Sequence, residues 1–322
     1  MLKNHADTAN MGRVKIIKGL SFFSFLFFLI LSGTSLLYSL IAKNPPKDTL
    51  ISPLVQTVRD SKEQLFSLFA SDLDSKVQGV LGENIGTYSI IVTNLKTGES
   101  YRQNPERQYY SASLYKLWLM ATVYQEMKNG TIKEDDVLEA SIPSLNATFK
   151  IASEEAELTE GSIKRTVKEA LEQSIIISHN YSALLLSKKV GVSKMAAFLK
   201  QEGLNNSKVG SPPLTSASDI ATFYLKLYRK ELVDEKSSEE MLALLKRQAL
   251  NDRIPKYLPN TTPVAHKTGE LYGYKHDAGI VFSTSGDYII VELSETKNPA
   301  TAAERMAQIS KIVYEYFENK KN

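Results

Sequence analysis

The sequence has no cysteine, so it can form no disulfide, no thiolate metal site and no thiol nucleophile. It has only four histidines, and none of them forms the i, i+4 pair of a helical zinc site: His5, His179, His266 and His276. With 39 basic and 36 acidic side chains, the composition indicates no basic surface for nucleic acid. We therefore expect no metal, no other cofactor and no nucleic-acid partner.

One long run of residues, 19–42, carries no charge and is rich in Phe, Leu and Ile. It is long enough to cross a bilayer as a helix. Arg13, Lys15 and Lys18 precede it, so the positive-inside bias predicts that residues 1–18 form a cytoplasmic stub. A cleaved signal peptide is the alternative, although the run does not end at a good small-x-small site. Either interpretation exports the rest of the chain. We expect a single-pass cell-membrane protein with an extracytoplasmic domain.

Residues 43–76 open with Asn44-Pro45-Pro46 and are expected to form a tether. Residues 77–322 then form the main domain, and 43% hydrophobic content is enough for a sizeable core.

Strand-like segments lie at both ends of this domain. Thr87–Thr93 alternates, a turn follows at Asn94–Gly98, and a short strand is expected near Tyr101. Helical periodicity covers the middle, at 113–128, 163–177, 181–190, 193–201, 217–228 and 239–248. Strands at 263–267, 278–283 and 288–293 and a helix at 302–317 complete the order. The order predicts an α/β (α+β) fold: an antiparallel sheet built from both ends of the domain, flanked by helices, with an inserted helical lobe. The site is expected between sheet and lobe.

The first candidate for chemistry is Ser113-Leu114-Tyr115-Lys116, at the start of an apolar helix. Serine and lysine three residues apart project from one helix face. Burial lowers the pKa of a lysine, which then can take a proton from a serine hydroxyl. A helix cap and a surface lysine are the alternative, and a second S-x-x-K at residues 294–297 shows how weak the pattern is alone.

Two further candidates follow in the chain. Ser178-His179-Asn180 lies between two predicted helices, and a polar capping turn is the alternative. Lys267-Thr268-Gly269 ends a predicted strand, where glycine lets another backbone such as a substrate's approach closely. Each has a decoy: Ser144-Leu145-Asn146 is expected in a loop, and Lys96-Thr97-Gly98 in the hairpin turn.

Together, in this order and context, the three motifs resemble those of class A β-lactamases and penicillin-binding proteins. The resemblance runs from about Ile85 to the C-terminus. Residues 251–255, 264–270 and 276–281 are also similar to stretches around the third motif of that family.

The resemblance implies a role for each motif residue. Ser113 would be the acylated nucleophile and Lys116 its base. Ser178 would carry the proton toward the leaving nitrogen. Asn180 would position Lys116 or the amide of the substrate.

The resemblance also implies how a substrate is held. Lys267 and Thr268 would bind its carboxylate, with Gly269 beside them. The backbone N–H groups of Ser113 and Glu270 would form the oxyanion hole. Lys275 or His276 is a candidate second cation, with a surface role as the alternative.

The chain departs from the family in two places. Class A β-lactamases carry a glutamate on a long loop after the second motif, which activates the deacylating water. Here that stretch is short and contains no E-x-x-L-N, and Glu202 is the nearest acid. His179 stands where the usual lactamase has aspartate. Both differences weaken antibiotic hydrolysis rather than acylation.

The sequence thus predicts a serine hydrolase that forms an acyl-enzyme on Ser113 and opens a β-lactam amide. One alternative is a D,D-peptidase or transpeptidase acting on peptidoglycan peptides. The other is a wall-binding or sensor domain with slow turnover.

Overall fold

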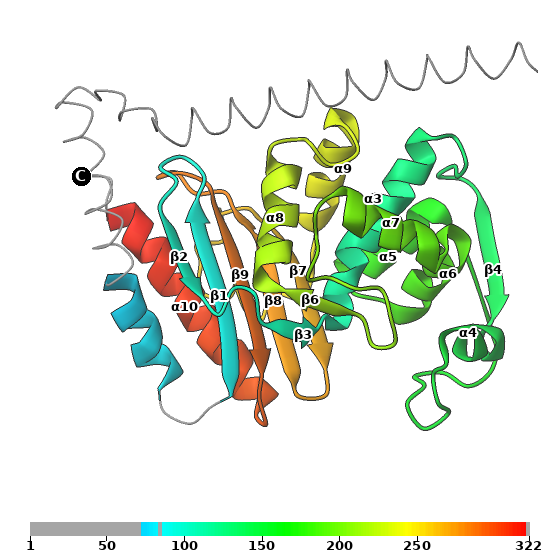
Figure 1. Ribbon diagram of the computed structural model, residues 1–322, viewed down its shortest axis with the longest axis horizontal. Helices are drawn as coiled ribbons and strands as arrows, with labels where there is room; N and C mark the ends of the chain where they lie inside the picture. The colour runs from blue at the N-terminus through cyan, green and yellow to red at the C-terminus, as the bar shows by residue number, and fades with distance from the viewer. Residues whose placement is uncertain (1–71, 83–85, 320–322) are drawn as a thin grey trace, which may run out of the picture. The chain divides into compact units, whose positions relative to one another are not determined.

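The computed structural model describes residues 72–82 and 86–319. Its centre is a five-stranded antiparallel sheet with the strand order β2-β1-β9-β8-β7 (Figure 1). The strands are β1 Thr87–Asn94, β2 Ser100–Gln103, β7 Val264–Leu271, β8 Tyr274–Val281 and β9 Tyr288–Glu295. Because β1 pairs with β9 along its whole length, the sheet is assembled from both ends of the domain. The predicted antiparallel α+β fold is confirmed.

Alternate residues of the central strands face two separate cores. Ile90 and Val92 pack with α10 (Pro299–Asn319) and with a helix at residues 72–81. Ile91, between them, packs with the helical lobe. Leu73 of the first helix is fully buried, so residues at the end of the expected tether contribute to this core. In Figure 1 the helix at residues 72–81 and α10 cover one side of the sheet, and the helical lobe lies on the other.

The lobe contains most of the helices and two small ribbons. Its helices are α3 Tyr115–Lys128, α4 Ile142–Phe149, α5 Val167–Ile176, α6 Asn180–Val190, α7 Val192–Gln201, α8 Ala217–Tyr228 and α9 Glu235–Leu245. A short 3-10 turn, η1 Ala112–Leu114, leads directly into α3. The ribbons pair β3 Gln108–Tyr110 with β6 Leu214–Ser216, and β4 Val137–Ser141 with β5 Ser162–Thr166.

The helix predicted at 163–177 starts too early in the chain. Ser162–Thr166 forms strand β5 beside β4, and the helix begins at Val167. The boundary is set by Thr166, whose hydroxyl accepts the Glu169 N–H while the Glu169 carboxylate accepts the Thr166 N–H. This capping box fixes the start of α5.

Three other boundaries also differ from the prediction. Ser144–Asn146 lies in α4 rather than in a loop, because the Ser141 hydroxyl caps that helix. Helix α9 begins earlier than residue 239, since Asp234 caps it. The strand predicted to end at residue 267 continues to Leu271, because its pairing with β8 runs to the hairpin turn.

Among the described residues, no helix has both the length and the apolar character needed to cross a membrane. The predicted stub, the run at 19–42 and residues 43–71 of the predicted tether lie outside the described residues.

Candidate active site

Three segments far apart in the sequence meet at the hydroxyl of Ser178. Its Oγ lies 3.2 Å from Lys116 Nζ and 2.9 Å from Lys267 Nζ. Lys116 lies in the first turn of α3, Ser178 in the turn between α5 and α6, and Lys267 in β7. Ser113 lies in η1, directly before α3. The structure therefore brings the three sequence motifs together between sheet and lobe.

Lys116 is completely buried and surrounded by oxygen atoms. Its Nζ donates to the Ser178 carbonyl at 2.6 Å and to Asn180 Oδ1 at 2.7 Å. Burial lowers the pKa of Lys116 to about 7, although the charge of Glu157 opposes the shift. Near neutral pH a substantial fraction of Lys116 is therefore an uncharged amine.

The backbone is strained at two points of this site. Ala112, next to Ser113, has φ of 45°, and Ser178 has φ of 58°. Such left-handed conformations are costly for residues other than glycine and persist only where the surroundings hold them. At Ser178 the conformation points the carbonyl and the hydroxyl at the same lysine, so the strain serves the contact with Lys116.

His179 caps helix α6. Its Nδ1 accepts the N–H of Ser182 at 3.1 Å, the contact that a carboxylate makes at this position of a helix. Burial lowers the pKa of His179, and the charges of Arg165 and Lys116 lower it further. The ring therefore stays neutral and able to accept at neutral pH. Histidine in place of aspartate keeps the helix start that positions Asn180.

Lys267 is the second buried lysine of the site. Its Nζ also donates to the Thr268 carbonyl, at 2.9 Å. Burial sets its pKa well below the usual value, and the charge of Lys116 lowers it further, while Asp277 opposes both. Two lysines thus face one hydroxyl, and the charge of Lys116 disfavours the protonated form of Lys267. An arriving carboxylate would offset this, because an opposite charge favours the protonated lysine.

Gly269 makes its close approach to the chain's own backbone. A Cβ at this position would lie 3.1 Å from the Ser111 carbonyl and 3.3 Å from Leu114 Cγ. The glycine thus lets β7 pack against the turn that carries Ser113. The expected close approach of another backbone is confirmed, and the backbone that approaches here is the chain's own.

The two candidates for a second cation differ in their surroundings. His276 is buried, its Nε2 lies 2.8 Å from the Tyr110 carbonyl, and burial lowers its pKa to about 4. It is therefore neutral and holds the strand that leads to Ser113. The Lys275 ammonium contacts the Glu270 carboxylate, which also accepts from Arg253 at 2.8 Å. The expectation of a second cation is therefore wrong for His276, whereas for Lys275 it stays a prediction.

The acids around the site differ from those that the sequence indicated. Glu202 pairs with Lys226 at 2.9 Å, so it is held at the end of α7 by a residue of α8. Glu157, from the loop before β5, instead reaches the site, where its Oε1 accepts from Asn180 Nδ2. No motif contains Glu157, and sequence reasoning missed it. The one available signal was the acidic loop after α4.

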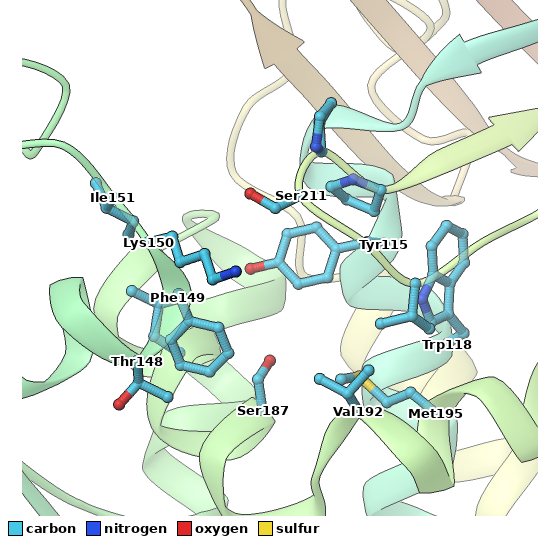
Figure 2. Close-up of a pocket in the computed structure, with 15 residues that line it drawn as sticks. Tyr115, Trp118, Thr148, Phe149, Lys150, Ile151, Ser187, Val192, Met195 and Ser211 are labelled. Carbon is cyan, nitrogen blue, oxygen red and sulfur yellow. The ribbon is translucent and has the colours of Figure 1, made fainter.

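A pocket of about 360 Å³ opens on another face of α3. Tyr115 and Trp118 line it from α3, and Phe149 and Lys150 from the end of α4 (Figure 2). The Tyr115 ring is also a wall of the site, since Lys116 Nζ lies 5.9 Å from its centre. The rest of the lining is mostly apolar. Among the described residues, no group of three or more His, Asp or Glu side chains is arranged to hold a metal ion.

Solved structures with the same fold include PBP-A and a beta-lactamase from Sphaerobacter thermophilus DSM 20745. PBP-A is 24% identical, with 77% of this chain and 96% of that chain covered and a TM-score of 0.69. The Sphaerobacter enzyme is 22% identical, with 77% and 98% covered and a TM-score of 0.68. A PBP-A mutant, solved as an acyl-enzyme complex with penicillin G, matches equally well at 24% identity, 77% and 97% coverage and a TM-score of 0.69.

Comparison with curated proteins gives no match. Residues 72–317, however, match the family described as the beta-lactamase enzyme family. The match spans most of the chain and includes all three motifs. The chain belongs to the beta-lactamase enzyme family.

Proposed function

We propose that this protein is a serine hydrolase whose Ser113 attacks the amide of a β-lactam and becomes acylated. One observation carries the proposal: Lys116 is buried, its pKa is lowered to about 7, and it lies three residues after Ser113 on the helix that follows η1. A nearly neutral, pre-positioned amine is what a serine hydroxyl needs as a base.

The oxygen contacts of Lys116 support this role. A neutral amine has two N–H groups and one lone pair. The Ser178 carbonyl and Asn180 Oδ1 can only accept, so they take the two N–H groups. The lone pair is then left to accept the proton of a hydroxyl group. This is the arrangement of a base rather than of a structural cation.

In the proposed acylation, Lys116 takes the proton of the Ser113 hydroxyl while Oγ bonds to the carbonyl carbon. The backbone N–H groups of Ser113 and Glu270 would stabilise the resulting oxyanion. Collapse breaks the C–N bond, and Ser178 passes the proton from Lys116 to the leaving nitrogen. The short contacts of Ser178 Oγ with both lysines support this transfer.

Substrate binding would use the second lysine. Lys267 and Thr268, with Gly269, would bind the carboxylate of the substrate, whose charge raises the pKa of Lys267 from its lowered value. Binding therefore favours the charged form of Lys267, and its charge in turn favours the neutral form of Lys116. The two lysines would be divided between binding and base catalysis.

A second candidate activity is that of a D,D-peptidase or transpeptidase on peptidoglycan peptides. Its acylation chemistry is the same. It is favoured by the stretch at 202–213, whose one acid, Glu202, is paired with Lys226 rather than with a group of the site. Without an acid there to activate water, the acyl-enzyme would be long-lived, as a transfer to another acceptor requires.

We also propose that residues 19–42 anchor the protein in the cell membrane, with the catalytic domain outside the cytoplasm. The uncharged run and the cations before it support this. Both candidate substrates are found on that side of the membrane.

The test uses the full-length chain in detergent with a fluorescent penicillin, and follows the intact mass over time. An adduct that forms on the wild type and is lost in Ser113→Ala would support the proposal. Release of hydrolysed drug within seconds to minutes would favour a lactamase, and a stable adduct the peptidase. A chain with neither adduct nor turnover would refute both enzymatic proposals and leave the wall-binding or sensor alternative.

A further inference from the structure

We propose that Glu157 makes the site selective for acyl donors that carry an ammonium group on the acyl side chain, next to the amide. The inference rests on the proposed function and adds a substrate class to it. It concerns a specificity residue, one that would touch the substrate without taking part in the acyl transfer.

The position of Glu157 is defined by Asn180, whose amide group has two different ends. Oδ1 accepts from Lys116 at 2.7 Å and is therefore committed to the base. Nδ2 is the end that is left to donate to a substrate carbonyl. In the structure Glu157 Oε1 accepts from one of the two N–H groups of this nitrogen. The carboxylate therefore lies where the amide of an acyl donor would be bound.

The loop that carries Glu157 is built to hold it there. The next residue, Leu158, has its carbonyl oxygen bonded by Asn146 Nδ2 and by the Tyr181 hydroxyl, each at 2.8 Å. These two partners belong to α4 and α6. Two residues earlier, Glu155 accepts from the Tyr272 hydroxyl at 3.1 Å, at the turn between β7 and β8. Contacts with the lobe and with the β7–β8 turn thus hold the loop around Glu157.

The charge of Glu157 has no counter-ion in this part of the protein. Among the described residues, no lysine or arginine forms an ion pair with it, and it accepts a hydrogen bond from a neutral amide. Its charge is nevertheless felt in the site, because it raises the pKa values of Lys116, Tyr115 and His179. A cation brought by the substrate would supply the missing partner.

Acyl donors with a neutral side chain and those with an ammonium group should therefore bind beside Glu157 with different free energies. A neutral acyl side chain places its carbonyl oxygen beside an unpaired negative charge. An ammonium group near the amide forms an ion pair with the carboxylate. Since Glu157 is exposed, the gain is modest, and we expect up to about a fivefold preference.

The experiment compares benzylpenicillin with ampicillin, which differ by one ammonium group beside the acyl amide. Acylation rate constants of the full-length chain are measured at pH 7 by competition with a fluorescent penicillin, where an α-amino group is largely protonated. We expect Glu157→Gln to lower the ampicillin-to-benzylpenicillin ratio about three- to fivefold. We expect the rate with benzylpenicillin to rise, since glutamine removes the negative charge beside the carbonyl oxygen of the substrate.

Glu160→Gln is the matched control, because it removes a carboxylate from the same loop without a contact to Asn180. It should leave the ratio unchanged. An unchanged ratio in Glu157→Gln would overturn the inference, as would an equal change in both variants. So would a slower loss of both adducts at an unchanged ratio, which would make Glu157 a base for deacylation. If the wild type is acylated by neither drug, the proposed function itself fails.

Discussion

Helix α3 has two faces that differ in how their polar groups are satisfied. On one, Nζ of Lys116 contacts three oxygen atoms: the carbonyl and hydroxyl oxygens of Ser178 and Oδ1 of Asn180. On the other, Tyr115 and Trp118 line an open pocket, and the buried indole N–H of Trp118 has no hydrogen-bond partner. A buried polar side chain is thus bonded on the first face and left without a partner on the second. Substitutions on the first face should therefore change acylation, and those of residues that line only the pocket mainly stability.

The largest effect is expected from Lys116→Met, which removes the amine but nearly keeps the volume. Acylation by a fluorescent penicillin should fall about a thousandfold, within the usual range for loss of a general base. Trp118→Phe, on the other face of the same helix, is the matched control and should stay within about threefold of the wild type. The proposed difference between the two faces would be refuted if Lys116→Met is acylated at the native rate while circular dichroism shows that it remains folded.

The pH dependence of acylation should report the same lysine. Below its pKa of about 7 Lys116 is protonated and cannot accept a proton, so the rate should fall about tenfold for each pH unit below 7. The charge of Glu157 raises this pKa, so Glu157→Gln should move the acid limb to lower pH. Stopped-flow acylation rates from pH 5 to 8 measure this acid limb for the wild type and for Glu157→Gln. A rate independent of pH between 5 and 7 would contradict the assignment of Lys116 as base.

The face of α3 that carries Lys116 could be predicted from sequence, because each motif is continuous in the chain. A serine and a lysine three residues apart on an apolar helix already imply a buried amine, and the order of the motifs excluded the decoys. Glu157 could not be predicted in the same way. It lies 23 residues before its partner Asn180, and its position depends on how α4 and α6 hold Leu158.

Burial explains the other errors of the sequence interpretation. Lys275 and His276 follow a turn and carry polar side chains, so they resemble surface residues. Only the pairing of β8 between β7 and β9 shows that this strand is interior, which leaves His276 neutral. Strand β5 was missed because five residues next to a helix show too few repeats to separate the two periodicities.

A smaller effect is expected at His179, which links the lysine face to α6. His179→Ala should lower the free energy of unfolding by about 1 kcal/mol, the usual cost of a lost cap, whereas His179→Asp should keep most of it. The pKa of His179 is lowered in the folded protein, so the unfolded chain binds the proton more readily. The contribution of the cap is therefore present above pH 6.5 and is lost as the pH falls below it. Urea unfolding at pH 7.5 and pH 5.5 measures this, and equal losses for alanine and aspartate would refute the capping role.

The smallest effect is expected from filling the pocket on the second face. Val192 lines it from the first turn of α7 and is 52% exposed, so Val192→Phe can extend over Trp118 without strain on the core. The added apolar contact should raise the free energy of unfolding by about 0.5–1 kcal/mol, as cavity-filling changes commonly do. Acylation by benzylpenicillin should not change, because none of the atoms that hold Lys116 moves. Val192→Ser, which removes apolar area at the same place, should have the opposite effect on stability and the same lack of effect on acylation. If Val192→Phe instead slows acylation severalfold at unchanged stability, the pocket belongs to the path of the substrate, and the two faces of α3 form one site.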